Sequence, residues 1–208
     1  MLNCKKCANA ENFYYGLEGK RFSESKILIV LHHSDRRVDE SENYLNVLSK
    51  TWTGKALRSV LKSCGLDFED VFITNFVKCT FPKYVRKKTK DVPISCSWDW
   101  NPGKEVYRNC RSVLEKQIEE LSPKVILFFG QKNFENIFEG ESGKISESFG
   151  KELNYKNIPC LVNLHPSKIY PYSHERRVTH YEPIQDFLSK YSLCRKLTRF
   201  PKQMKIRF

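Results

Sequence analysis

The sequence lacks long apolar runs. The longest are Ile27–Leu31 and Val125–Phe129, far shorter than the roughly 20 residues that a membrane-spanning helix needs. We therefore expect no membrane association. The residues after Met1 also lack the apolar core of a secretory signal peptide. These two absences together favour a cytoplasmic protein.

Nucleotide-binding motifs are missing as well. No glycine-rich dinucleotide fingerprint follows any strand-like run, and no phosphate-loop motif occurs. Chemistry based on nicotinamide cofactors or ATP is therefore disfavoured. No internal repeat or low-complexity block is present either, which excludes a repeat array. A chain of 208 residues then fits one α/β domain, here residues 1–189, followed by a tail at 190–208.

Acidic residues are in the minority. The chain has 36 Lys and Arg against 24 Asp and Glu, a formal net charge of +12. Such an excess attracts a polyanion and supplies affinity for phosphates that does not depend on sequence. We interpret it as a sign of nucleic-acid binding; the alternative is a surface charge that serves solubility alone.

Four short runs are almost continuously apolar, which is typical of parallel strands buried on both faces. They are Ile27–Leu31, Val71–Asn75, Val125–Phe129 and Cys160–Leu164. Stretches with apolar residues at helical spacing lie between and after them, at 56–64, 106–121 and 181–191. This alternation predicts a three-layer α/β/α fold with a central four-stranded, mostly parallel sheet.

Polar groups follow each predicted strand, where ligands of parallel sheets bind. The strand ends carry, in chain order, His32-His33-Ser34-Asp35-Arg36, Thr74-Asn75, Gly130-Gln131 and His165-Pro166-Ser167. Because the carboxyl ends of parallel strands meet at one edge, we expect a functional site there, with Asn75 and His165 in it. The alternatives are that Asn75 only forms a turn and that His165 only hydrogen-bonds a loop.

Cysteine usage points to a metal site rather than to disulfides. Of the eight cysteines, Cys64, Cys160 and Cys194 have apolar neighbours and are expected to be buried thiols. The Cys4-Lys-Lys-Cys7 hook can place two thiolates on one metal centre and needs two further ligands from elsewhere.

Two basic stretches contain aromatic residues. Residues 83–98, which we expect to be an insertion, include Lys87 and Lys88. The tail has seven Lys and Arg and no acid. Basic side chains interleaved with aromatics suit contact with DNA phosphates and bases, and we favour that for 83–98. For the tail, DNA contact and a solvated charge run remain equal alternatives.

The order of these motifs resembles one family. The pieces are the Cys4/Cys7 hook, Ile73–Cys79, Cys110–Lys124 and His165–Ser167. Together they resemble the iron–sulfur uracil-DNA glycosylases, families four and five, from residue 4 to about 189. Each piece alone is weak evidence for this family, whereas their order and spacing together are specific for it.

The resemblance implies a [4Fe-4S] cluster held by four thiolates. Cys4, Cys7 and Cys79 match directly. The fourth ligand is Cys110 by motif context or Cys96 by spacing, and we favour Cys110. We expect a structural cluster that fixes the N-terminus and the basic segment near DNA; zinc on the same thiolates is the alternative.

The resemblance also assigns roles in the excision of a base that has been flipped out of DNA. His165 is expected to donate to the oxygen of the departing base, and Asn75 to read the pyrimidine edge. Ser167, Lys168 and Ile169 are expected to contact DNA, with Ile169 as the apolar wedge. Trp52 stands where the family has a stacking aromatic; packing in the core is the equal alternative.

The first motif departs from the family pattern. The family has Gly-Glu-Ala-Pro-Gly or a close relative after the first strand, and this chain has His32–Arg36. His33 replaces the acid that positions water. We therefore expect Asp35 to activate water, with Asp39 or Glu40 as alternatives, or His33 to act as the base. His32 would then border the base. The rebuilt motif also fits a bulkier modified pyrimidine or a loss of catalysis.

The sequence thus predicts a monomeric, monofunctional DNA glycosylase, cytoplasmic and associated with the nucleoid, that releases uracil or a modified base and leaves an abasic site. One alternative is a non-catalytic DNA-binding relative that keeps the fold and the cluster. The other is a cluster-bearing redox or sensor protein.

Overall fold

The computed structural model describes residues 4, 6–7, 13–33, 48–79, 103–138, 149–169 and 174–194. Its centre is a six-stranded sheet in the order β1-β3-β2-β4-β6-β5. The inner four strands are parallel: β2 (Ile27–His33), β3 (Val71–Val77), β4 (Val125–Phe129) and β6 (Ile158–Asn163). The edges, β1 (Leu17–Glu18) and β5 (Glu152–Tyr155), are antiparallel.

The α/β class and the mostly parallel sheet are confirmed, but the sheet has six strands where the apolar runs predicted four. The inner strands are buried along most of their length, so each appears in the sequence as an apolar run. Strand β1 is only two residues long. In β5 exposed and buried residues alternate, so neither edge strand produces such a run. Strand β3 also continues two residues past Asn75, to Val77.

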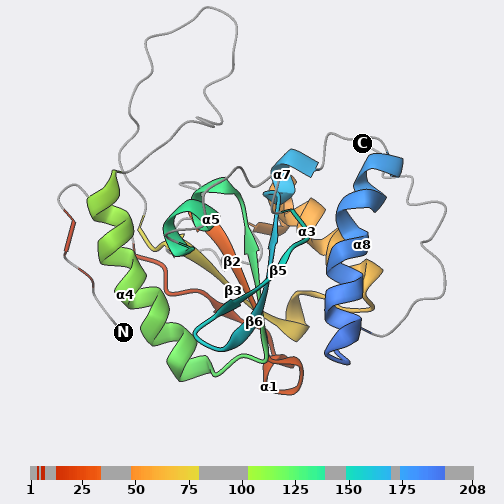
Figure 1. Cartoon of the computed structure of the whole chain (residues 1–208), viewed down its shortest axis with the longest axis horizontal. Helices are drawn as coiled ribbons and strands as arrows, with labels where there is room; N and C mark the ends of the chain where they lie inside the picture. Colours follow the sequence, from red (N-terminus) through yellow and green to blue (C-terminus); the bar gives the residue numbers. More distant parts are fainter. Residues whose placement is uncertain are drawn as a thin grey trace, which may run out of the picture.

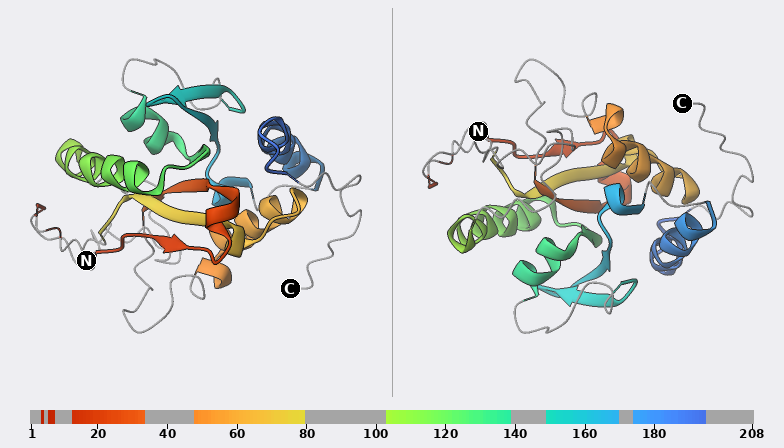
Figure 2. Two further views of the ribbon diagram at one scale, coloured as in Figure 1. Left: turned by 90° about the horizontal axis from the view of Figure 1, so that it is seen from below. Right: turned by 90° about the horizontal axis from the view of Figure 1, so that it is seen from above.

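Helices cover both faces of the sheet (Figure 2). One face packs on α4 (Lys104–Leu121), α5 (Gln131–Ile137) and the short α1 (Phe22–Ser25). The other packs on α3 (Trp52–Ser63) and α8 (His174–Lys190). A short 3-10 helix, η1 (Phe68–Asp70), precedes β3, and α7 (Pro166–Ile169) follows β6. The three-layer arrangement is therefore the predicted one.

Helix α3 shows why these segments become helical. Its N-cap Thr51 accepts a hydrogen bond from the Gly54 backbone N–H at 3.0 Å, which satisfies one of the orphan donors of the first turn. Leu57 and Leu61 lie one turn apart and are fully buried against the sheet. Truncating either side chain to alanine would cost about 2–5 kcal/mol of stability.

The carboxyl edge of the sheet is braced by Asn133 at the start of α5. Its buried side-chain amide donates to the carbonyl oxygen of Val30 at 3.0 Å and to that of Phe129 at 2.9 Å. These bonds link β2 to the last residue of β4. The two buried hydrogen bonds of Asn133 therefore hold β2 and β4 together at the edge where we expect the site.

None of the helices in the described part of the chain is both long and apolar enough to cross a bilayer.

Candidate functional site

The predicted site residues gather at the carboxyl ends of the inner strands, at the upper edge of the sheet in Figure 1. His33 ends β2, Gly130 follows β4, and His165 follows β6 before α7 begins. Asn75 lies on β3, paired in register with Leu31 of β2. Four separate segments of the sequence thus meet at one edge.

Asn75 faces the side of the sheet covered by α3 and α8. Its neighbour Thr74 points the opposite way, because the Thr74 hydroxyl donates to the Tyr15 carbonyl oxygen at 2.8 Å, and successive side chains of a strand alternate. Leu31, the register partner of Asn75, packs in the core on the α3 side. His33, the last residue of β2, has its ring 4.9 Å from the ring of His32. The Asn75 side chain is buried, with 2% of its surface exposed.

His165 directly precedes α7, and α7 packs against α3 and α8. His165 therefore lies on the side of the sheet that these two helices cover. A glycine makes room for it: Gly130 has φ of +100°, and a Cβ there would stand 3.5 Å from the His165 Cβ. The charge of His33 acts on His165, so the two rings are near each other. Strands β3 and β6 are three sheet spacings apart, about 14 Å.

The surroundings of His165 favour a neutral ring that carries its proton on Nε2. Nδ1 lies 2.8 Å from the Ser167 hydroxyl oxygen and accepts a longer bond, 3.4 Å, from the Ser167 backbone N–H. A backbone N–H can only donate, so Nδ1 is the acceptor and Nε2 bears the hydrogen. Burial, then the charges of His33 and Lys168, lower the pKa of His165 to about 4.

His32 lies beside His33, with 4.9 Å between the ring centroids, and reaches toward α4. Its Nε2 lies 2.8 Å from the Tyr107 hydroxyl of α4, and the two rings stack at 5.9 Å. Burial, then the charges of His33, His165 and Lys132, lower its pKa to about 2, so this ring is neutral too. A base-binding role for His32 stays a prediction. Tyr107 was missed by the sequence-based reasoning, although it lies one helical turn before Cys110.

Trp52 is the first residue of α3, and 57% of its surface is exposed. The alternative that it packs in the core is therefore wrong, and its stacking role stays a prediction. Lys168 is exposed, and Ser167 is partly buried against His165. For Ile169 only the backbone is described. Asp35, Lys87, Lys88 and Cys96 lie outside the described residues.

The four favoured ligand cysteines come together at the start of α4. Burial, then the charges of Cys110, Cys4 and Cys7, raise the pKa of the Cys79 thiol to about 12. The pKa of Cys110 is raised chiefly by burial, with contributions from Cys7 and Cys4. A hydrogen bond of 3.4 Å from the Asn109 amide to the Cys7 sulfur ties the hook to α4. Even so, no three histidine, cysteine or acidic side chains of the described segments are arranged to hold a single metal ion.

A buried lysine lies beside these thiols. Lys78 has none of its surface exposed, and its ammonium donates to the Thr74 hydroxyl at 2.5 Å and to the Gln117 side-chain oxygen at 2.6 Å. Burial lowers its pKa to about 7, while Cys110 acts in the opposite direction. The sequence-based reasoning overlooked this residue; its signal was a lone cation between Val77 and Cys79 at the end of an apolar strand.

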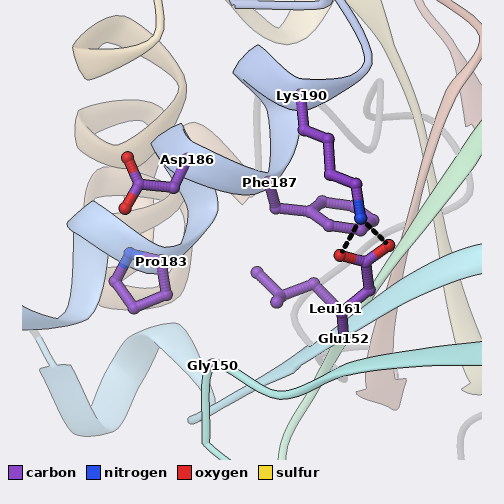
Figure 3. Close-up of a pocket in the computed structure, with 7 residues that line it drawn as sticks. All are labelled: Gly150, Glu152, Leu161, Pro183, Asp186, Phe187 and Lys190. Carbon is purple, nitrogen blue, oxygen red and sulfur yellow. Dashed lines mark hydrogen bonds and ion pairs between the residues drawn. The ribbon is translucent and has the colours of Figure 1, made fainter.

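A cavity of about 330 Å³ lies elsewhere, between β5, β6 and α8 (Figure 3). One of its carboxylates, Glu152, is engaged by Lys190 at 2.8 Å and by the Tyr191 hydroxyl at 2.5 Å. The lining of the cavity includes neither Asn75 nor His32, His33 or His165. We therefore place the candidate site at the strand ends and not here.

The chain is similar to known proteins over most of its length. The family model described as the uracil DNA glycosylase superfamily matches residues 10–189. The chain is 26% identical over 177 residues to a protein of Archaeoglobus fulgidus named type-4 uracil-DNA glycosylase, covering 81% of this chain and 79% of that protein. A protein of Saccharolobus solfataricus with the same name is 26% identical over 188 residues, covering 90% and 77%. The fold, the edge at which the polar groups meet and the span of the family match lead to one conclusion: the chain belongs to the uracil-DNA glycosylase superfamily.

Proposed function

We propose that this protein is a monofunctional DNA glycosylase that hydrolyses the N-glycosidic bond of uracil or a modified pyrimidine in DNA and leaves an abasic site. The observation that carries the proposal is the neutral His165, with its proton on Nε2, on the same face of the sheet as Asn75. The names of the two archaeal relatives support it.

The chemistry follows from where charge develops. The target base is flipped out of the DNA, and the glycosidic bond breaks toward an oxocarbenium-like sugar and a departing base anion. The Nε2–H of His165 donates to the base oxygen on which the negative charge grows. A preorganised donor of this kind contributes about 3–4 kcal/mol to transition-state stabilisation. Water then adds to the sugar, and its proton goes to a base that we place at Asp35 or His33.

Asn75 supplies selectivity in this scheme. A side-chain amide offers both a donor and an acceptor, as does the edge of uracil. Because Asn75 is buried, a base that mismatched this pattern would leave polar groups unpaired, which is costly in a dry pocket. The exposed Lys168 beside the site favours the approach of DNA phosphates.

We also propose that Cys4, Cys7, Cys79 and Cys110 hold a [4Fe-4S] cluster. Their thiols lie near enough to affect one another's ionisation, and four thiolates are the ligand set that such a cluster uses. Zinc on the same four thiolates is the alternative. When bound, the cluster supplies a structural cross-link between the N-terminal hook, the end of β3 and α4.

A base-release assay tests the proposed activity. Labelled oligonucleotides with uracil, deaminated purines or C5-modified pyrimidines would be incubated with the wild type, with His165→Ala and with His180→Ala as a matched control from α8. We expect free base and an abasic site with the wild type and the control, and a rate about 100-fold or more lower with His165→Ala.

The second candidate is a non-catalytic DNA-binding relative. The observation that favours it is His33 at the place where the family has an acid. It predicts that wild type and His165→Ala bind the oligonucleotides equally well and that neither releases a base. Absence of abasic product on every substrate would decide for this candidate and against the glycosylase.

A further inference from the structure

Two cysteines outside the proposed cluster lie in contact with each other. Cys64 is the C-cap of α3, and Cys194 follows the end of α8. Their thiols share a hydrogen bond, although the two residues lie far apart in the sequence. The expected burial is confirmed for Cys64, which is fully buried, whereas Cys194 is partly exposed and packs against the edge of the same part of the core.

The way in which the two helices end explains why these sulfurs meet. At the end of α3 the chain turns back, with the Leu66 backbone N–H donating to the Leu61 carbonyl oxygen at 2.9 Å. Helix α8 ends in the same way: the Leu193 N–H donates to the Leu188 carbonyl oxygen at 2.8 Å, and Ser192 has φ of +58°. Bonds of this span close a Schellman motif. Each turn places a cysteine beside the end of its helix.

The two helices are also fastened to each other next to the pair. The Gln185 side chain of α8 donates to the backbone carbonyl oxygen of Ser63 at 2.6 Å, and Ser63 directly precedes Cys64. Leu188 lies in the same buried apolar cluster as Cys64, and Leu193 packs against it. The contact between the sulfurs is therefore set by packed helix ends.

The two thiols are not equivalent toward an oxidant. The hydrogen bond with Cys194, and then burial, raise the pKa of the Cys64 thiol, so Cys64 keeps its proton at neutral pH. Cys194 is the more exposed of the two, and an oxidant dissolved in water reaches it first. A cysteine that is oxidised in contact with a second thiol condenses with it to a disulfide.

We propose that Cys64 and Cys194 are a redox-active pair, which a hydroperoxide converts into a disulfide that links the end of α8 to α3 and stabilises the fold. The Cys194 sulfur attacks the peroxide and becomes a sulfenic acid, and one water leaves. The Cys64 sulfur then attacks the sulfenic sulfur, and the S–S bond forms as a second water leaves. The two sulfurs are oxidised by two electrons in total, and the peroxide is reduced. The cross-link would also fix the start of the basic tail, since Arg195-Lys196 follows directly.

The test exposes the full chain to hydrogen peroxide and compares the wild type with Cys194→Ser and with Cys160→Ala. Cys160 is a fully buried thiol of β6 and serves as the matched control. Each protein is digested with trypsin without reductant, and mass spectrometry measures the amount of peptide 63–78 joined to peptide 191–195, which carry one cysteine each. The Tm is recorded before treatment, after treatment and after dithiothreitol.

We expect the joined peptides and a rise in Tm of about 5 °C or more in the wild type and in Cys160→Ala, both reversed by dithiothreitol, because the disulfide closes a loop of about 130 residues. Cys194→Ser should show neither, and its treatment controls for the effect of peroxide on the other cysteines. Treated wild type without joined peptides would overturn the proposal. Joined peptides without a gain in Tm over Cys194→Ser would overturn the stabilising link. If Cys194→Ser does not fold, the change in the wild-type Tm on adding dithiothreitol decides.

Discussion

The neutral state of His165 has a consequence for stability that can be measured without a substrate. In the unfolded chain an imidazole has its ordinary pKa of 6.5, whereas in the fold the pKa of His165 is about 4. Between these two values the unfolded chain binds a proton that the folded chain does not. The free energy of unfolding must therefore decrease as the pH falls from about 6.5 to about 4.

The size of this effect follows from the shift. The lowering of the pKa from 6.5 to about 4 corresponds to at most about 3 kcal/mol, reached near pH 4 and absent above pH 7. In His165→Gln no proton is taken up at this position. The variant should consequently lose about 2–3 kcal/mol less stability than the wild type on acidification, whatever its stability at neutral pH.

Urea denaturation at about pH 7 and pH 4.5 measures this difference. Other acid-sensitive groups, including His32, are present in both proteins and cancel in the comparison. We expect the gap between the two unfolding free energies to change by about 2 kcal/mol or more in favour of His165→Gln at the lower pH. A gap that is the same at both pH values would show that His165 titrates normally, and the argument for a neutral donor would fail.

Three further substitutions test the site residue by residue. Ser167→Ala should slow base release about three- to tenfold with unchanged DNA affinity, because it removes a hydrogen bond that orients His165; an unchanged rate in single-turnover kinetics would contradict this. Trp52→Ala should change the urea midpoint little, since the side chain is 57% exposed, yet weaken DNA binding by about 1–3 kcal/mol in a titration; equal affinity would exclude stacking. Asn75→Asp replaces the amide donor with an acceptor and should lower uracil release roughly 100-fold or more; near-normal release would remove Asn75 from base recognition.

The parallel core of the sheet was predictable because strands buried on both faces must be apolar along their length. The run Val125–Phe129 coincides with β4. The edge strands were not predictable in this way: β5 exposes alternate residues and exists because it pairs with β6. An edge strand depends on its neighbour more than on its own composition.

The site was predictable to the extent that it follows from strand ends. Asn75 and His165 lie on the expected edge and on one face. The direction of His32 was not predictable, since it depends on where α4 brings Tyr107. The burial of Lys78 was not predictable, because a lysine is ordinarily a surface residue. Only the packed structure shows that its side chain is fully buried.

The most direct test of the central claim, that Asn75 and His165 act on one flipped base, is a double-mutant cycle in single-turnover base release. The rates of wild type, Asn75→Ala, His165→Ala and the double variant are measured on the best substrate. If both side chains bind the same base in the transition state, the second substitution should cost much less in the background of the first, with a coupling of about 0.5–3 kcal/mol. Losses that multiply independently would mean that the two residues do not share a pocket.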